Sequence, residues 1–537
     1  MRYSGLIIVL LALVADAQEP LRAPRPITEP QAPKLQYRTV TAEEVDELIA
    51  VAVERNVADF KAASDPVFLR RVTLDLLGRQ PTLEEQNVFL NDDSTGKRQR
   101  LIERCLAHPD FGKNWANYWS DTISYRVTPP ELTFLNYEPL KEWLAEQFNQ
   151  NVAWDEVVTE ILTSTGKVSE EPAATFVAYH QGEPTKLAAE TARIFLGVQI
   201  QCAECHDHPF DDWKRDQFHS LAAYFARTQV KMPHNKGAAT VVSAKEKGEY
   251  KMPNADPGKK GQEMQPVFLS GQQMDAGRPD HERRAELAQL LTDNRNRWFA
   301  RAFVNRLWDR IAGDGFYSPV DNMGVNQPQL LPEVHESLTD HFLATGYDVK
   351  DLFQLILNTR YYGQEIPTDL PERTHPFAYL EQTRLRGDEV FDSLQTALDV
   401  PVVRKPTPKP TAEIRFPPPP KTIQESVAET FGYDPSFGPQ VVQRTMSQAM
   451  LMMNNEELQA QVDADPESGT VLAKLLQSET DDAQVITKLY RLLLARKPTD
   501  RELKICWQHV QSIEDRGAAF EDVLWSLINS TEFTTRR

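Results

Sequence analysis

The sequence predicts a mainly α-helical, multi-domain protein with a small β-containing excursion near residues 229–273. Apolar residues recur at helical spacing through two long stretches, residues 41–228 and 279–520. Helix start and stop signals divide both stretches into separate helices. In the connecting segment between them, residues 229–278, Lys, Gly and Pro become frequent and short apolar runs favour strands. The 537 residues are enough for several domains and a large core.

The N-terminus has the parts of an export signal. A basic residue precedes a short apolar stretch (residues 6–14), and an A-x-A cleavage site follows at residues 15–17. We therefore expect a signal peptide, residues 1–17, and a secreted or periplasmic mature protein that begins near Gln18. The apolar stretch is too short to cross a bilayer, and no later segment is long and apolar enough, so no membrane span is expected. The proline-rich residues 18–40 are predicted to form an extended tether.

The first helical stretch contains clear helix boundaries. Asp65-Pro66 predicts a helix start, and Gly78 predicts the end of that helix. The capping box from Thr82 to Glu85 predicts the start of the next helix. One face of a later helix carries four aromatic residues, which favours core packing over a sugar-stacking platform. These four residues are Trp115, Tyr118, Trp119 and Tyr125.

The run Cys202-Ala203-Glu204-Cys205-His206 has the spacing of a c-type haem attachment site. At such a site the two thiols add across the haem vinyl groups, and the adjacent histidine becomes the proximal iron ligand. Residues 188–201 have a helical pattern, so the motif should lie at or just beyond a helix C-terminus. Export agrees with covalent haem attachment. Because an exported chain leaves the reducing cytosol, export also permits a disulfide.

Three interpretations of the motif stay open. In the first, Cys202 and Cys205 form thioethers to haem c and His206 is the proximal ligand, oriented by Asp207 and His208, which are also alternative metal ligands. In the second, the two thiols and both imidazoles hold one zinc or iron ion; in the third, the thiols form a structural or redox disulfide. Four such local ligands would be geometrically unusual for zinc, so haem is favoured. Candidate distal iron ligands are His180, His219, Met232, His234 and Met252.

The connecting segment and the second helical stretch follow the motif. Val241-Val242 and Val267-Phe268-Leu269 suggest short strands. In the second stretch, the run from Trp298 to Trp308 is helical and should break at Gly313. Two further segments are a proline-rich surface crossing at residues 401–421 and the C-terminal helix end at residues 521–537.

One internal similarity is visible. Residues 76–85 resemble residues 493–502, because both combine a helix end, a basic turn, a proline and a capping box. Each segment is followed by a helix that ends in a phenylalanine, Phe111 in the first case and Phe533 in the second. A duplicated helical hairpin and the convergence of helix junctions on the same chemistry are both open interpretations.

Charge and motif content exclude several functions. The net charge of −19 at neutral pH would repel nucleic acid and anionic lipid, so neither is expected as a main partner. The sequence lacks the G-x-S-x-G, Walker, G-x-G-x-x-G and H-E-x-x-H motifs, which leaves hydrolase and nucleotide chemistry without support. Its four cysteines are too few for a disulfide scaffold. Cys105 and Cys506 lie on apolar helix faces, which predicts buried free thiols, with a disulfide between the two helical stretches as the alternative.

Five segments together resemble a known pairing of domains. Residues 68–82 and 197–210, the second of which contains Cys-His-Asp-His-Pro-Phe, resemble the planctomycete cytochrome C-like domain family. Residues 302–308, 313–316 and 384–389 resemble the planctomycete secreted domain of unknown function that usually follows it. The Cys-His-Asp-His-Pro-Phe segment is specific to the first family, and the other segments are diagnostic in combination.

The resemblance covers roughly residues 43–520 and implies an exported protein whose cytochrome character rests on Cys202, Cys205 and His206. It implies electron transfer or oxidoreductase chemistry, and the occurrence of the family beside sulfatase and carbohydrate-degrading genes suggests a link to complex polysaccharides. Longer members carry an additional N-terminal cytochrome c domain, so we expect a separate redox partner protein here. The alternative is a polysaccharide-binding, envelope-binding or structural protein in which the cysteine-histidine cluster is a structural metal or disulfide site.

Overall fold

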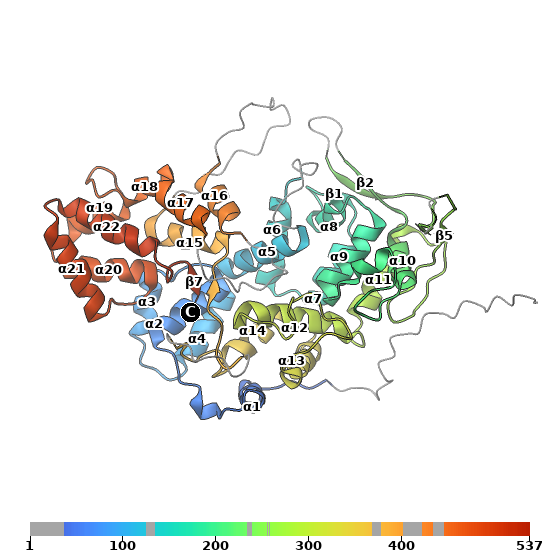
Figure 1. The fold of residues 1–537 in the computed structure, drawn as a ribbon, viewed down its shortest axis with the longest axis horizontal. Helices are drawn as coiled ribbons and strands as arrows, with labels where there is room; N and C mark the ends of the chain where they lie inside the picture. Colours follow the sequence, from blue (N-terminus) through green and yellow to red (C-terminus); the bar gives the residue numbers. More distant parts are fainter. Residues whose placement is uncertain are drawn as a thin grey trace, which may run out of the picture.

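The computed structural model confirms the mainly α class and the small β-containing excursion (Figure 1). The predicted signal peptide, nearly all of the tether, most of the proline-rich crossing, Tyr125 and His234 lie outside the residues that the structure describes. No described helix is long and apolar enough to cross a membrane. The described residues are 37–124, 135–232, 239–254, 256, 258–367, 377–400, 421–432 and 445–536.

Helices form nearly all of the regular structure in both predicted stretches. The first stretch contains α1 (Ala42–Ala52), α2 (Asp65–Leu77), α3 (Leu83–Leu90), α4 (Lys97–Ala107), α5 (Pro109–Ser124), α6 (Glu138–Gln150), α7 (Trp154–Thr163), α8 (Thr175–Tyr179), α9 (Pro184–Leu196) and α10 (Arg215–Ala222). The second contains α11 (Asp280–Thr292), α12 (Arg297–Ala312), α13 (Pro332–Ala344), α14 (Val349–Leu357), α15 (Gly387–Leu398), α16 (Ile423–Thr430), α17 (Met446–Asn454), α18 (Glu456–Val462), α19 (Val471–Ser478), α20 (Asp482–Leu494), α21 (Asp500–Ser512) and α22 (Arg516–Ile528).

The helix boundaries around Gly78 follow the predicted signals. Gly78 ends α2 with φ of 68°, a left-handed conformation that glycine adopts without a steric penalty. Thr82 and Glu85 form the predicted capping box of α3, each side chain bonding the other residue's backbone N–H. One detail differs, because Ser64 is the N-cap of α2 and Asp65 is already its first helical residue. In the second stretch, α12 ends at Gly313 as predicted.

The excursion contains short antiparallel strands. β2 (Thr228–Lys231) pairs with β3 (Val241–Ala244), and β3 also pairs with β1 (Gly166–Lys167), which comes from the first helical stretch. β4 (Lys251–Met252) pairs with β5 (Gln262–Glu263). The predicted strand at Val241-Val242 is therefore confirmed, whereas Val267 forms only an isolated bridge to Gln273. A third small sheet joins β6 (Thr383–Arg384) to β7 (Thr535–Arg536) near the C-terminus.

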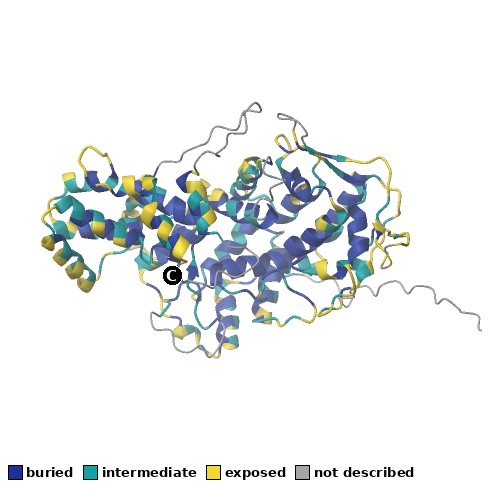
Figure 2. Ribbon diagram, turned by 45° about the horizontal axis from the view of Figure 1, so that its top comes forward, coloured by how far each residue is buried: buried dark blue, intermediate teal, exposed yellow. Residues whose placement is uncertain are grey.

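Two hydrophobic cores organise the helices. The larger core takes side chains from residues 40–380 and so continues across the connecting segment into α11–α14. The smaller core takes its side chains from residues 385–533, together with Leu74 of α2, and includes α15–α22, coloured orange to red at one end of Figure 1. Figure 2 shows that buried residues run along the inner faces of the helices and that exposed residues gather on outer turns and loops. The first half of the second helical stretch is thus packed against the first stretch.

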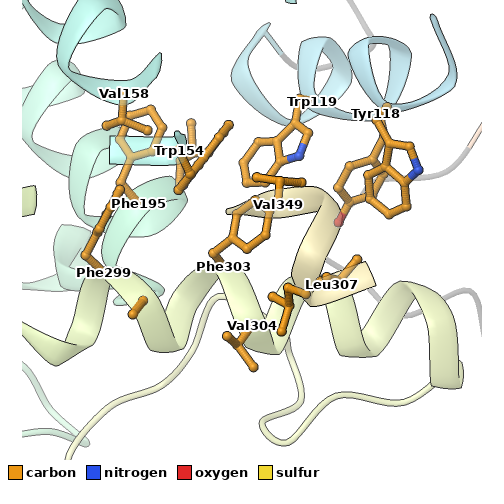
Figure 3. Close-up of a cluster of buried hydrophobic side chains, with 14 of the residues drawn as sticks. Tyr118, Trp119, Trp154, Val158, Phe195, Phe299, Phe303, Val304, Leu307 and Val349 are labelled. Atoms are coloured by element: carbon orange, nitrogen blue, oxygen red, sulfur yellow. The ribbon is translucent and has the colours of Figure 1, made fainter. Parts of the chain in front are cut away.

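An aromatic cluster lies within the larger core (Figure 3). Phe303 of α12 is stacked on Trp119 of α5 with 5.7 Å between ring centroids, and Trp154 of α7 lies 4.3 Å from Trp119. Trp115, Tyr118 and Trp119 are all buried, so core packing is confirmed for the three described members of the predicted aromatic face. Such ring pairs stabilise a core beyond the area that they bury.

The internal similarity extends to side-chain contacts. Gly78 and Ala495 both end a helix in the left-handed conformation, with φ of 68° and 56°. The basic residue that follows each one binds the glutamate of the next capping box through two nitrogens and also binds a second carboxylate. These contacts are Arg79 with Glu85 and Asp110, and Arg496 with Glu502 and Glu532. Both turns are therefore held by the same arrangement of one arginine and two carboxylates.

Two buried histidines predict a loss of stability in acid. Burial lowers the pKa of both His180 and His335 from 6.5 to about 4. As the pH falls below 6.5, these histidines bind protons in the unfolded chain before they do so in the folded protein, so the free energy of unfolding decreases progressively down to about pH 4. Each histidine is expected to lower the free energy of unfolding by roughly 3 kcal/mol over this range, at about 1.4 kcal/mol per pKa unit.

The test compares urea unfolding midpoints at neutral and acid pH for three variants. His335→Gln and His180→Gln should each flatten the pH dependence, whereas His281→Gln, at an exposed position, should leave it unchanged. A pH dependence that is the same in all three variants would contradict this account.

Candidate functional site

The cysteine-histidine motif lies in the loop between α9 and α10. α9 ends at Leu196, and Gly197 follows in the left-handed conformation with its N–H bonded to the carbonyl of Ala192. A short 3₁₀ helix, Ile200–Glu204, then carries Cys202. The motif therefore follows a helix end as predicted, but the expected continuation of that helix to residue 201 is wrong. The left-handed turn at Gly197 stops it five residues before the first cysteine.

The motif is anchored on its inner side and open on its outer side. Ile200 and Ala203 are buried and fix the 3₁₀ helix to the larger core. Cys202, Cys205 and His206 are exposed, and both thiols are free. Phe210, which follows closely, is 78% exposed despite its size. Two thiols, an imidazole and an apolar ring from one short segment thus face solvent. We call residues 197–213 the Cys-His segment.

The ring of His206 has a defined hydrogen-bond arrangement. Its Nδ1 lies 2.7 Å from the backbone carbonyl oxygen of Asp207. A carbonyl only accepts hydrogen bonds, so in the neutral ring this contact assigns the proton to Nδ1 and leaves the lone pair on Nε2. A metal-bound histidine is typically held in the same way, with its other ring nitrogen donating to a carbonyl.

Asp207 and His208 serve different parts of the loop. The Asp207 carboxylate accepts the backbone N–H of Arg215 at 3.1 Å and lies 3.2 Å from Nζ of Lys214. The backbone hydrogen bond, with a smaller contribution from Lys214, lowers the pKa of Asp207. The backbone N–H of His208 donates to the carbonyl of Trp213 at 2.8 Å. Nδ1 of the His208 ring accepts a hydrogen bond from the backbone N–H of Phe210 at 3.3 Å. Asp207 therefore reaches His206 through its backbone, and His208 closes the following turn.

A second set of contacts holds the carbonyl of Glu204, inside the motif. Arg215 Nε donates to this oxygen at 3.2 Å, and His219 Nε2 lies 2.9 Å from it. The hydroxyl of Tyr250, from the excursion, lies 2.7 Å from Nδ1 of the same histidine. Burial lowers the pKa of His219 and raises the pKa of Tyr250 to about 12, so both stay neutral around neutral pH. Sequence reasoning missed Arg215 and Tyr250, although the spacing of four between Arg215 and His219 places both on one helix face.

The candidate distal ligands are placed as follows. His219 has both ring nitrogens in hydrogen bonds, and His180 is buried against Phe176 and Tyr179. Met252 packs with Ala223 and Met264 in a small cluster of its own. Met232 is partly buried against the larger core. Of the described candidates, His219 therefore contacts the motif directly, but it does so as a hydrogen-bond partner of the backbone.

The donors of the motif were also candidates for a compact metal cluster. Within the described part of the chain, no group of three or more His, Cys, Asp or Glu side chains is arranged so that it could hold a metal ion. Cys202, Cys205, His206 and His208 thus do not converge on one point here. Two exposed thiols next to an imidazole in the sequence are compatible with covalent haem, because thioether formation needs reachable thiols and iron ligation needs the lone pair of a ring nitrogen.

The other two cysteines lie elsewhere and are free thiols. Cys105 is buried on α4, and burial raises the pKa of its thiol to about 12. Cys506 is only partly buried on α21, and its sulfur lies 3.8 Å from the hydroxyl of Tyr490. The predicted free thiol at a buried position is confirmed for Cys105, and the two residues are not bridged in the structure.

Comparison with known proteins matches two separate segments of the chain to family models. Residues 44–230 match the family described as PSCyt2, protein of unknown function (DUF1549), and residues 283–510 match PSD1, protein of unknown function (DUF1553). Among curated proteins and among solved structures, nothing matches the chain. The tandem pair expected from the resemblance is therefore confirmed. The chain carries a PSCyt2 (DUF1549) domain followed by a PSD1 (DUF1553) domain, and both are families of unknown function.

Proposed function

We propose that the Cys-His segment attaches haem c covalently and that the protein transfers electrons in an exported compartment. The observation that carries this proposal is the ring of His206, whose Nδ1 is engaged by the Asp207 carbonyl at 2.7 Å while Nε2 is left to bind iron. This arrangement occurs next to two exposed free thiols with the spacing of a haem attachment site.

Each residue of the segment has a role in this proposal. Cys202 and Cys205 would hold haem c through thioethers, each made by addition of an S–H to a vinyl group with nothing released. His206 would bind the iron, and the Asp207 carbonyl would fix the tautomer of its ring. Bound haem supplies one-electron redox chemistry. Phe210, four residues after His206 in the sequence, carries an exposed apolar ring.

The exposure of the donors supports exchange of electrons with a separate protein. Cys202, Cys205 and His206 are all exposed, so haem held by them would be accessible to a partner. The partner that we propose is a separate redox protein, and a role in complex polysaccharide processing is the biological setting that we propose for it. No nucleic acid is proposed as a partner, because the chain is strongly acidic.

The alternative function has its own supporting observation. Cys202 and Cys205 are three residues apart, free and exposed, so an oxidising compartment would favour a disulfide between them. The protein would then be a polysaccharide-binding, envelope-binding or structural protein. An intact mass that is two hydrogens lower than the reduced chain, with no haem, would favour this alternative.

Electron transfer is tested with protein exported from a host that matures c-type cytochromes. A spectroelectrochemical titration should show reversible one-electron reduction, and the reduced protein should then reduce a small soluble c-type cytochrome. A haem that cannot be reduced reversibly, or that never passes its electron on, would contradict the proposed role.

Export is tested by N-terminal mapping of the same material. The first residue should be Gln18 or a neighbouring residue, and a retained Met1 would overturn the export proposal.

A further inference from the structure

The Cys-His segment is held by a loop of the PSD1 (DUF1553) domain. This loop, residues 313–331, connects α12 to α13. The N–H of Met323 donates to the carbonyl of Gly197 at 2.7 Å, at the turn that leads into the motif. A Cβ added to Gly324 would collide with the carboxylate of Asp211, so the two loops are in close contact. The motif belongs to one family domain, and the loop that holds it belongs to the other.

Asp321, in the same loop, contributes a charged side chain to this contact. The Asp321 carboxylate is fully buried, and one of its oxygens forms an ion pair with Arg193 of α9 at 2.7 Å. The other oxygen accepts a hydrogen bond from Nε2 of Gln199 at 2.9 Å. Gln199 precedes Cys202 by three residues, so a single side chain of the PSD1 domain binds both the helix before the motif and the turn that carries it.

The surroundings of Asp321 favour the ionised carboxylate. Burial alone would raise its pKa, but the guanidinium groups of Arg306 and Arg193 outweigh burial and lower the pKa. Arg193 is itself held by Glu190 at 2.7 Å and donates to the carbonyl of Thr122. A charge buried in this way is costly to leave without its partner, so removing one member of the set should loosen the others.

We propose that Asp321 is a positioning residue that fixes the Cys-His segment from the PSD1 domain, so that the site is built by both domains. Gln199 is the link between the buried carboxylate and the motif. A second contact points the same way, because Trp213 at the end of the segment packs edge-on against Trp298 of α12, with 6.4 Å between ring centroids. For its effect on haem the inference rests on the proposed function, whereas the positioning of the segment does not.

Two variants and one matched control test the proposal in the full chain. The two variants differ in how strongly they are expected to disturb the buried charges. Asp321→Asn removes the charge, and Gln199→Leu removes only the link while leaving the pair of Asp321 and Arg193 intact. The control is Asp280→Asn, since Asp280 is equally buried, binds Arg284 at 2.8 Å and accepts the hydroxyl of Thr228, in contacts that do not involve the segment. The control therefore reports the general cost of neutralising a buried, paired aspartate.

The first measurement is hydrogen–deuterium exchange of the peptide covering residues 197–213. Asp321→Asn and Gln199→Leu should each speed its exchange by about tenfold or more, because the hydrogen bonds that hold the segment are lost. Asp280→Asn should leave this peptide within about twofold of the parent protein. Equal exchange in all variants, or equal acceleration in Asp280→Asn, would overturn the proposal.

The second measurement is the reduction potential of the haem-loaded protein. It should shift in Asp321→Asn and in Gln199→Leu and stay unchanged in Asp280→Asn, because only the first two substitutions remove contacts that hold the segment carrying His206. If the parent protein carries no haem, the proposed function fails, but the exchange measurement still decides whether Asp321 positions the segment. An unchanged potential in a haem-loaded Gln199→Leu protein would also count against the proposal.

Discussion

Replacing Cys202 and Cys205 together by alanine is expected to abolish covalent haem attachment completely. Both thioethers come from these two thiols, and axial ligation by His206 alone does not retain haem once the protein is unfolded. Both side chains are exposed, so the double substitution should cost little stability. The loss should therefore appear as an absence of haem from a folded protein.

The measurement is the intact mass and absorption spectrum of the purified double variant beside the parent protein. Cys506→Ala is the matched control. Like Cys202 and Cys205, Cys506 is a free thiol that is not fully buried, but it lies on α21, outside the Cys-His segment. It should keep the mass of one haem and an unchanged Soret band. Haem that stays covalently bound after both Cys202 and Cys205 are replaced would refute the attachment site.

The second large effect separates His206 from its neighbour His208. His206→Ala should abolish or grossly alter the Soret band and the reduction potential, because the imidazole whose Nε2 is open would be lost. His208→Ala should leave haem attached and shift the potential modestly, since His208 bonds only the backbone of its own turn through Trp213 and Phe210.

The same pair of variants distinguishes haem from a local metal cluster. In a cluster both imidazoles would be ligands, so losing either would weaken metal binding severely. The discriminating measurement is the haem and metal content of the two variants, prepared side by side. Equal and severe metal loss in both, with no haem in the parent protein, would decide for the cluster and against the cytochrome.

Local signals in the sequence predicted much of the helical structure. Gly78 and the capping box from Thr82 to Glu85 give the end of one helix and the start of the next, because each depends on residues within one turn. The early end of α9 had a comparable signal in Gly197, but the apolar residues after it continue a helical pattern and suggested a longer helix. Periodicity therefore correctly predicted that the motif follows a helix, but it placed the end of α9 too late in the sequence.

Contacts between distant segments could not be predicted in the same way. Asp321 lies 122 residues from Gln199 in sequence, and nothing around it marks it as a partner of the motif. Tyr250 reaches the motif through His219 from an excursion whose strands were visible only as short apolar runs. The larger core also continues from α9 and α10 into α11–α14, although composition changes sharply between them. Such contacts depend on tertiary packing, which composition and spacing do not specify.

The central claim is that Cys202, Cys205 and His206 hold haem c, and one measurement tests it most directly. It is the absorption spectrum of the natively exported parent protein, recorded before and after extraction with acid acetone. We predict a Soret band that stays with the protein, because thioether bonds resist this extraction whereas axial ligation does not. A protein from a host with working cytochrome c maturation that shows no Soret band and contains stoichiometric zinc would contradict the claim.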